Sequence, residues 1–75
     1  MDRFAETEIA LLERLRSLKA SPDMSINLLD IHAPLDAAGF STDEVTAVLN
    51  ALEQDKIAAF IPGRRLLILK ELPEA

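Results

Sequence analysis

The four-residue segment STDE that begins at Ser41 constrains the fold more than any other stretch, because it specifies where a helix starts. In a capping box, the serine hydroxyl accepts a hydrogen bond from the backbone N–H of the third helical residue. The side chain of that third residue accepts a bond from the serine N–H in return. Ser41 and Glu44 have this spacing, and Phe40 and Val45 lie where a hydrophobic staple would place them. The sequence therefore predicts a well-capped helix over about residues 42–55.

The apolar residues of this helix recur at helical spacing, which places them on one side. They are Val45, Val48, Leu49 and Leu52. We expect this side to face the core of the protein and the opposite side to face solvent.

A second predicted helix, over about residues 28–38, closes at Gly39, since glycine is the usual residue just past a helix end. Asn27 or Asp30 can cap its beginning. If Asp30 is the cap, Pro34 lies in the first turn, where no hydrogen bond of the helix is lost. If Asn27 is the cap, Pro34 lies inside the helix and is expected to kink or split it. We predict a helix through 28–38 with a distortion near Pro34.

Residues 3–20 have the pattern of an amphipathic helix, uninterrupted by glycine or proline. Acidic side chains lie early in it and basic ones late, which complements the helix dipole. Pro22 is expected to end the helix region, because the residue before a proline is pushed out of the α conformation. Residues 24–26 can then form a short extended segment. The apolar stripe of the helix consists of Phe4, Leu11, Leu15 and Leu18, widened by Ile9 and Leu12.

Two apolar runs, 57–61 and 66–69, flank the segment PGRR at 62–65. Proline followed by glycine suits the two central positions of a type II turn, because proline presets its own φ and glycine accepts a positive one. The sequence therefore predicts a β-hairpin over about residues 57–70, followed by a loose tail from Leu72 onward.

The hairpin is more apolar than its packing requires. A hairpin that packs on helices normally buries one face, which gives alternating apolar and polar residues, yet both runs are apolar throughout. If Leu66 and Ile68 face the core, Leu67 and Leu69 are exposed; the opposite register exposes the other set. Unless the tail and the first helix cover it, an apolar patch remains, and such patches commonly mark protein contacts. The candidate contact residues are Phe60, Leu67 and Leu69.

The chain has 75 residues, of which 49% are hydrophobic, so we expect one α+β domain, 1–75, with a single core. A core of this size seldom contributes more than about 3–5 kcal/mol, and the chain has no cysteine for a stabilising disulfide. Self-association is therefore a reasonable expectation from size alone.

The chain carries a net charge of −5, and only the part from residue 57 onward has an excess of basic side chains. This balance gives no general attraction to nucleic acid or to anionic lipid. The first eight residues lack the pattern of a signal peptide, and the apolar runs are too short to span a bilayer. We expect a cytoplasmic protein with no membrane partner.

Groups suited to catalysis are few. The chain has a single histidine, His32, no cysteine, no glycine-rich phosphate loop, and carboxylates scattered along the predicted helices. A lone histidine near Asp30 is more often a surface or capping residue than a metal ligand, because a metal site needs further donors. We expect no enzymatic activity, no catalytic residue, no metal, no cofactor and no small-molecule substrate.

The order of the predicted elements resembles the winged helix-turn-helix superfamily over nearly the whole chain. That order is helix, short extended segment, helix, tight turn, helix and hairpin. The residues that carry the resemblance are Gly39 in the turn, Val45, Leu49 and Leu52 in the third helix, and Ile57 at the start of the hairpin. The resemblance implies an α+β fold of three helices with a C-terminal β-hairpin wing, in which the segment after the first helix can add a short extra strand.

In DNA-binding members of the superfamily, the third helix enters the major groove and the wing contacts the backbone or the minor groove. Carried onto this chain, the resemblance makes Thr46, Asn50 and Gln54 the base-reading candidates, because they form one row on the outer side of the helix. Asparagine and glutamine can bond bidentately to adenine. Arg64 and Arg65 are the matching candidates on the wing.

The charge of the third helix opposes this function. Its acidic residues are Asp43, Glu44, Glu53 and Asp55, whereas Lys56 is its only cation. Affinity for duplex DNA depends largely on Lys and Arg contacts to phosphates. We therefore favour a non-catalytic recognition module that acts through protein contact or homodimerisation, with a DNA-binding transcriptional regulator as the alternative.

Overall fold

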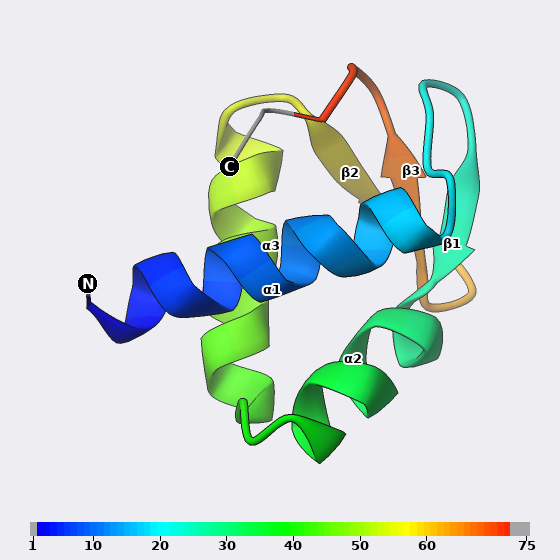
Figure 1. The fold of residues 1–75 in the computed structure, drawn as a ribbon. Helices are drawn as coiled ribbons and strands as arrows, with labels where there is room; N and C mark the ends of the chain where they lie inside the picture. The colour runs from blue at the N-terminus through cyan, green and yellow to red at the C-terminus, as the bar shows by residue number, and fades with distance from the viewer. Residues whose placement is uncertain (1, 73–75) are drawn as a thin grey trace.

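The computed structural model describes residues 2–72 and contains three helices and one antiparallel sheet (Figure 1). In chain order the elements are α1 (Arg3–Ser17), β1 (Ser25–Asn27), α2 (Leu28–Ala37), α3 (Thr42–Gln54), β2 (Ala58–Ile61) and β3 (Arg65–Ile68). The predicted α+β class and the wing-like C-terminal hairpin are confirmed, and β1 is the short extra strand after the first helix. The remainder of the predicted tail, residues 73–75, lies outside the described residues.

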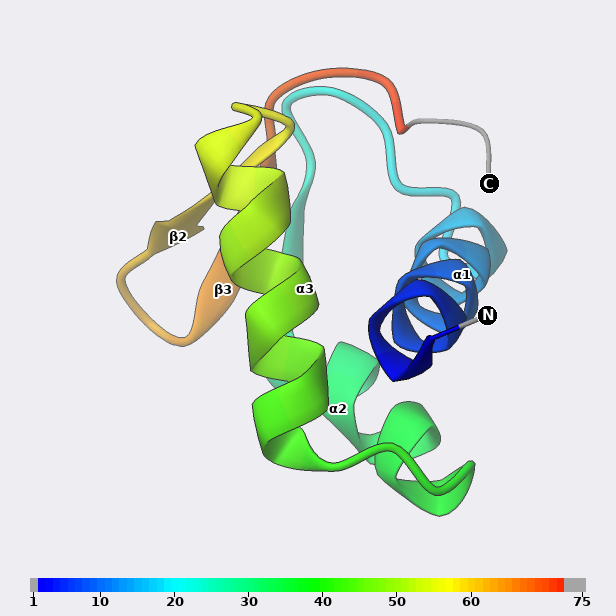
Figure 2. The same ribbon diagram turned by 90° about the vertical axis from the view of Figure 1, so that its left-hand side faces the viewer.

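The sheet has the strand order β1-β3-β2, so β3 is its central strand. Within the hairpin, Ala58 pairs with Ile68 and Phe60 with Leu66. On the other side of β3, Ile26 of β1 pairs with Leu66. Figure 2 shows α3 between the hairpin and α1, so this helix joins the two halves of the molecule.

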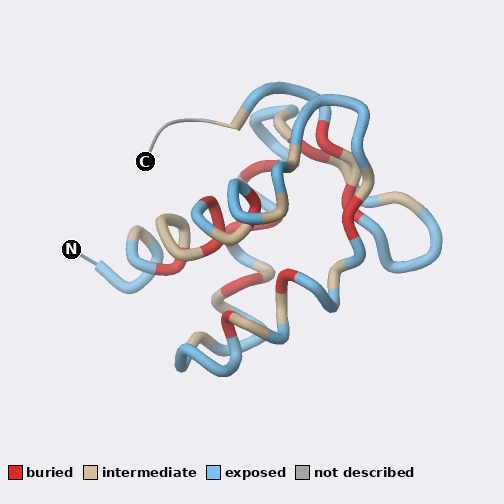
Figure 3. Tube along the Cα trace, turned by 45° about the vertical axis from the view of Figure 1, so that its right-hand side comes forward, coloured by how far each residue is buried: buried red, intermediate tan, exposed pale blue. Residues whose placement is uncertain are grey.

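The core lies where the helices meet one face of the sheet, and the buried segments of the chain converge there in Figure 3. The predicted inward side of α3 is confirmed, since all four of its apolar residues are buried. The other large buried side chains are Leu11, Leu12 and Leu15 of α1, Ile26 of β1, Ile31 and Leu35 of α2, and Leu66 and Ile68 of β3.

The buried stripe of α1 differs from the predicted one at its N-terminal end. Phe4 is 44% exposed, and Thr7 is fully buried in its place. A buried threonine is tolerated because its hydroxyl donates a 2.8 Å hydrogen bond to the carbonyl of Arg3. Leu11, Leu12 and Leu15 are buried as predicted.

Helix α1 ends at Ser17, before the predicted end near residue 20. Lys19 adopts a left-handed conformation with a φ of 57°, and the N–H of Ala20 bonds back to the carbonyl of Leu15 at 3.0 Å. This is the Schellman arrangement, which satisfies carbonyls at a helix end. The helix therefore stops through a local turn, and Pro22 lies beyond it.

Helix α2 begins with Asn27 as its cap, whose side chain accepts a 2.9 Å hydrogen bond from the N–H of Leu29. Of the two caps considered, this is the one that places Pro34 inside the helix. The helix ends in the predicted glycine turn, where Gly39 has a φ of +98°. The turn is a second Schellman arrangement, because the N–H of Phe40 bonds to the carbonyl of Leu35 at 2.9 Å.

The predicted capping box of α3 is present in both directions. The N–H of Glu44 donates to the Ser41 hydroxyl at 3.1 Å, and the N–H of Ser41 donates to the Glu44 carboxylate at 2.9 Å. Arg3 of α1 also donates to Glu44, and it donates to the carbonyl of Gly39 at 2.6 Å. Its guanidinium lies 4.4 Å from the centroid of the Phe40 ring. Arg3 thus holds the start of α1 against the turn between α2 and α3.

This contact shifts the pKa of both ionisable groups. The hydrogen bond from Arg3, together with the backbone N–H of Ser41, lowers the pKa of the Glu44 carboxyl. The same carboxylate raises the pKa of Arg3. Both shifts favour the charged forms, so the interaction is maintained at neutral pH.

In the described part of the chain, no helix has the length and the apolar composition needed to cross a membrane.

Candidate protein-contact surface

The register of the hairpin decides which of its residues face the helices. Leu66 and Ile68 are fully buried on the helix side of β3, and Ala58 is buried opposite them on β2. Of the two registers that the sequence left open, the structure has the one with Leu66 and Ile68 inward. Because side chains alternate along a strand, Leu67 and Leu69 project to the other side.

We call the other side the outer sheet face. Its apolar members are Ile57, Ala59, Ile61, Leu67 and Leu69, and Arg65 lies on the same side because it pairs with Ile61. Ala59 pairs with Leu67 across the hairpin, and the N–H of Leu69 bonds to the carbonyl of Ile57 at 2.8 Å, which extends the same register. Leu69 is 42% exposed, and the other members keep partial exposure. The outer sheet face therefore exposes an apolar surface beside the charged side chain of Arg65.

Phe60 does not belong to the outer sheet face. It pairs with Leu66, whose side chain is buried on the helix side, so Phe60 projects towards that side as well. It is nevertheless 38% exposed, because β2 is the last strand of the sheet and has no strand beyond it. The three candidate contact residues are thus divided, with Leu67 and Leu69 on the outer sheet face and Phe60 at the border of the opposite side.

The outer edge of β2 has no partner strand within the described residues. The bond from Leu69 to Ile57 directs the carbonyl of Ile57 towards β3. In an antiparallel pair, successive residues direct their backbone groups alternately to the two sides, so those of Ala58 and Phe60 point away from β3. No hydrogen bond within the described residues engages these groups, but Ala58 is only 1% exposed, so the fold covers its groups and the edge is accessible only around Phe60. We call this row the open edge of β2.

The two candidate arginines of the wing make different contacts. Arg65 donates from Nε to the hydroxyl of Ser25 at 3.1 Å and from Nη2 to the Ser25 carbonyl at 3.4 Å, so its side chain lies across β3 towards β1. Arg64 occupies the turn with a φ of 58°, next to Gly63 with a φ of +88°. Its carbonyl accepts a 2.9 Å bond from the N–H of Leu28, which ties the tip of the wing to the start of α2.

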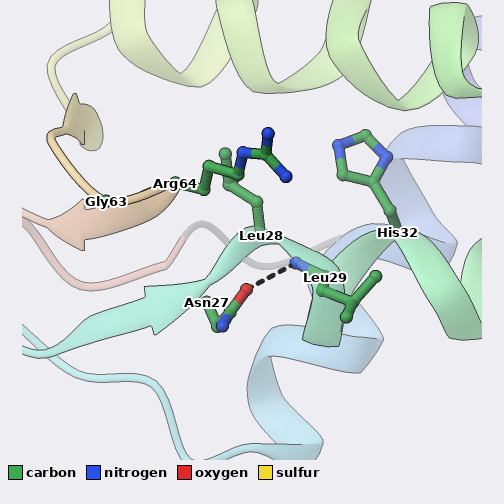
Figure 4. Close-up of a pocket in the computed structure, with 6 residues that line it drawn as sticks. All are labelled: Asn27, Leu28, Leu29, His32, Gly63 and Arg64. Carbon is green, nitrogen blue, oxygen red and sulfur yellow. Dashed lines mark hydrogen bonds between the residues drawn. The ribbon is translucent and has the colours of Figure 1, made fainter.

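A shallow hollow lies between this turn and α2. Its lining residues are Asn27, Leu28, Leu29, His32, Gly63 and Arg64. Figure 4 shows the guanidinium of Arg64 and the ring of His32 on the same side of the segment that joins β1 to α2. Among residues 2–72, no group of three or more histidine, aspartate or glutamate side chains is placed to hold a metal ion.

The solvent side of α3 carries the row suggested for DNA reading. Asn50 and Gln54 are exposed, and Thr46 is half-buried. Glu44 lies in the first turn of the same helix and is engaged by Arg3 and Ser41, whereas Asp43 and Glu53 are exposed along the helix. The row is therefore accessible, but its surroundings are acidic.

No family model, curated protein or solved structure was found to match the chain.

Proposed function

We propose that this chain is a non-catalytic winged-helix recognition domain that works by protein–protein contact, and that the contact is association of two copies through the hairpin. The arrangement of three helices, a short extra strand and a C-terminal hairpin is compatible with membership of the winged helix-turn-helix superfamily. Membership is part of the proposal, and a shared fold by itself assigns no function.

One observation carries the proposal, namely that the hairpin keeps apolar surface on the side that the helices do not cover. Leu67 and Leu69 contact solvent on the outer sheet face, and Phe60 contacts it at the open edge. Isolated exposed apolar residues are common, but contiguous ones on a sheet mark sites of association. The core of so short a chain is small, so covering this surface would also stabilise the fold.

The most direct test of association places a charge in the middle of β2. Ala59 lies on the outer sheet face and is partly exposed, so a lysine there can extend into solvent without disturbing the pairing with Leu67. In the Ala59→Lys variant, association through the hairpin would bury a charge or bring two like charges together. We expect the wild type to be dimeric by light scattering after gel filtration and Ala59→Lys to be monomeric.

Ala47→Lys is the matched control, because Ala47 is an exposed alanine on α3 and receives the same charge. We expect this variant to remain dimeric. If Ala59→Lys associates as strongly as the wild type, the hairpin is not the site of contact. If the wild type is monomeric at every concentration, association itself is wrong.

DNA binding is the second candidate function, supported by the row of Thr46, Asn50 and Gln54 on the solvent side of α3. Under this alternative, replacing Arg64 and Arg65 by alanine removes the phosphate contacts of the wing and sharply weakens duplex binding, with little effect on association. Ala47→Lys, beside the reading row, would strengthen binding to duplex DNA. Under the favoured proposal, neither change produces or removes a complex with DNA.

A further inference from the structure

Among residues 2–72, Arg64 is the arginine whose guanidinium has no hydrogen bond or ion pair. The chain contains 13 acidic side chains against eight Lys and Arg, so acids are not in short supply. The other four arginines are all engaged within the protein, namely Arg3, Arg14, Arg16 and Arg65. The fold therefore leaves one guanidinium available to a group from outside the described chain.

The turn of the wing holds the backbone of Arg64 beside α2. The carbonyl of Arg64 accepts the 2.9 Å hydrogen bond from the N–H of Leu28, the first residue of that helix. At the neighbouring Gly63, no atom lies within 4 Å of the position that a Cβ would occupy, so the space beside the turn is open. The guanidinium is thus placed at the hollow between the turn and α2.

This hollow combines a cation, a hydrogen-bonding ring and apolar walls. Figure 4 shows the guanidinium of Arg64 and the imidazole of His32 on the same side of the segment that joins β1 to α2. Leu28 and Leu29 supply the walls, and Leu29 is 68% exposed. No aspartate or glutamate lines the hollow. A guanidinium can bind a carboxylate through two parallel hydrogen bonds, and an imidazole N–H can donate a third.

A second hollow continues the first along α2. Leu29 and His32 line both hollows, and the second is completed by Ala33, Asp36, Phe40 and Thr42. We call the two hollows together the α2 groove. The ten residues of α2 span about 15 Å, which is the length of about four to five residues of extended chain. An elongated, shallow groove fits a segment of polypeptide better than a small molecule, because small-molecule sites enclose most of their ligand.

We propose that the α2 groove binds a short segment of another protein in which an acidic residue is followed by an apolar one. The carboxylate binds Arg64 and His32, and the apolar side chain covers Leu29. The exposed carboxylate of Asp36 lies at the other end of the groove, so the acidic residue of the segment is placed at the end nearer the wing. This binding goes beyond the association of two copies and does not require it, because no residue of the outer sheet face lines the groove.

A protein carboxylate fits the α2 groove better than the phosphates of DNA. Affinity for a duplex depends on several cations that contact phosphates together, and Arg65, the other arginine of the wing, is held at Ser25. A phosphate also carries no apolar group to cover Leu29, whereas an apolar residue beside a carboxylate does. The leucine wall thus favours a polypeptide.

The net charge of −5 opposes any acidic partner at long range. At physiological salt, however, exposed charges more than about 8 Å apart are largely screened. The groups that line the groove therefore decide whether a carboxylate binds. A short segment brings one carboxylate to them, whereas a second copy brings its whole excess of acidic side chains.

The test is an NMR titration of the isotope-labelled wild type at physiological salt. The probe is the blocked tetrapeptide acetyl-Glu-Leu-Ala-Ala-amide, and its neutral counterpart has glutamine in place of glutamate. We expect the glutamate peptide to shift the backbone amide signals of residues 28–33 and 63–64. We expect the glutamine peptide to bind about fivefold more weakly or less, because it loses the charge interaction with Arg64.

Two variants with the same change of charge identify the cation that binds the peptide. Arg64→Gly removes the guanidinium and keeps the turn, because glycine accepts the φ of 58°. Lys56→Gly is the matched control, since Lys56 also has a φ of 58° but lies after α3, outside the groove. Both variants relieve a left-handed backbone and are expected to fold. Arg64→Gly should weaken binding of the glutamate peptide about fivefold, and Lys56→Gly should leave it unchanged.

Three results would overturn the proposal. If the glutamate peptide shifts none of these signals, or the glutamine peptide binds as tightly, the groove does not recognise a carboxylate. If both glycine variants weaken binding equally, the effect comes from net charge and not from the groove. If duplex DNA shifts the same signals and the peptide does not, Arg64 binds phosphate and the DNA-binding alternative is favoured. Association through the hairpin is tested separately by Ala59→Lys, so the two proposals can fail independently.

Discussion

The Nε of Arg14 donates a 3.0 Å hydrogen bond to the backbone carbonyl of Asp30, which lies four residues before Pro34. In a regular helix, that carbonyl accepts a bond from the N–H of the residue four positions later. Pro34 has no N–H, so α2 leaves this carbonyl without its usual partner. A side chain from α1 supplies the missing donor, and the same bond joins α1 to α2.

This relationship predicts that Arg14 and Pro34 are energetically coupled. Arg14→Ala is expected to lower the free energy of unfolding by about 1 kcal/mol, because the Asp30 carbonyl loses its donor. In a Pro34→Ala background the alanine N–H can take that carbonyl, so the same replacement is expected to cost less. The measurement is a double-mutant cycle by urea unfolding. Equal costs of Arg14→Ala in both backgrounds would contradict the account.

Glu44 is expected to make stability depend on pH. Its pKa is lower in the folded protein than in the unfolded chain, so its contribution is fully present above the unfolded value of about 4.3. That contribution is lost as the pH falls through the lower pKa of the folded state. Glu44→Gln keeps an acceptor for the Ser41 N–H but loses the charge interaction with Arg3.

The variant should therefore lose less stability than the wild type when urea unfolding is compared at pH 7 and at about pH 3. Glu53→Gln removes the same charge from the other end of α3 and controls for the change in net charge. Identical losses in the wild type and in Glu44→Gln would show that the contact with Arg3 does not stabilise the fold.

The turn that follows α3 suggests a stabilising substitution. Lys56 follows α3 with a φ of 58°, and the N–H of Ile57 bonds to the carbonyl of Leu52 at 2.9 Å, the same arrangement that Gly39 forms after α2. A side chain disfavours this left-handed conformation. Lys56→Gly is expected to raise the free energy of unfolding by about 0.5–1 kcal/mol.

Gly39→Ala is the converse change. Nothing lies within 4 Å of the position that its Cβ would occupy, so any loss of stability reports the backbone conformation alone. We expect a loss of about 1 kcal/mol from urea unfolding. A gain with Gly39→Ala, or a loss with Lys56→Gly, would contradict the assigned turn conformations.

Local signals in the sequence predicted α3 and the turn that precedes it. The capping box of Ser41 and Glu44 involves residues three positions apart, and Gly39 is the residue type that its positive φ favours. The end of α1 was not predictable in the same way, because Lys19 adopts a left-handed conformation that its residue type does not favour. The interactions of Arg3 and Arg14 were missed because each joins segments that are distant in the sequence.

The sequence predicted which residues form the candidate surface better than it predicted how they are arranged. Continuous apolar runs in a hairpin already indicated surplus hydrophobic surface, and Leu67 and Leu69 lie on it. The place of Phe60 depends on its pairing with Leu66, and the open edge of β2 depends on β1 having paired with the far side of β3. Strand order of this kind is a long-range property, which local residue patterns do not determine.

The central claim is that the chain works by associating through its hairpin and does not read DNA. The measurement that tests it most directly is sedimentation velocity of the wild type, alone and with mixed duplex DNA, at low and at physiological salt. We predict a dimer that forms with increasing protein concentration and does not sediment with DNA at either salt concentration. A monomer that sediments with DNA, and does so less as salt increases, would contradict the claim and make Thr46, Asn50 and Gln54 the reading face.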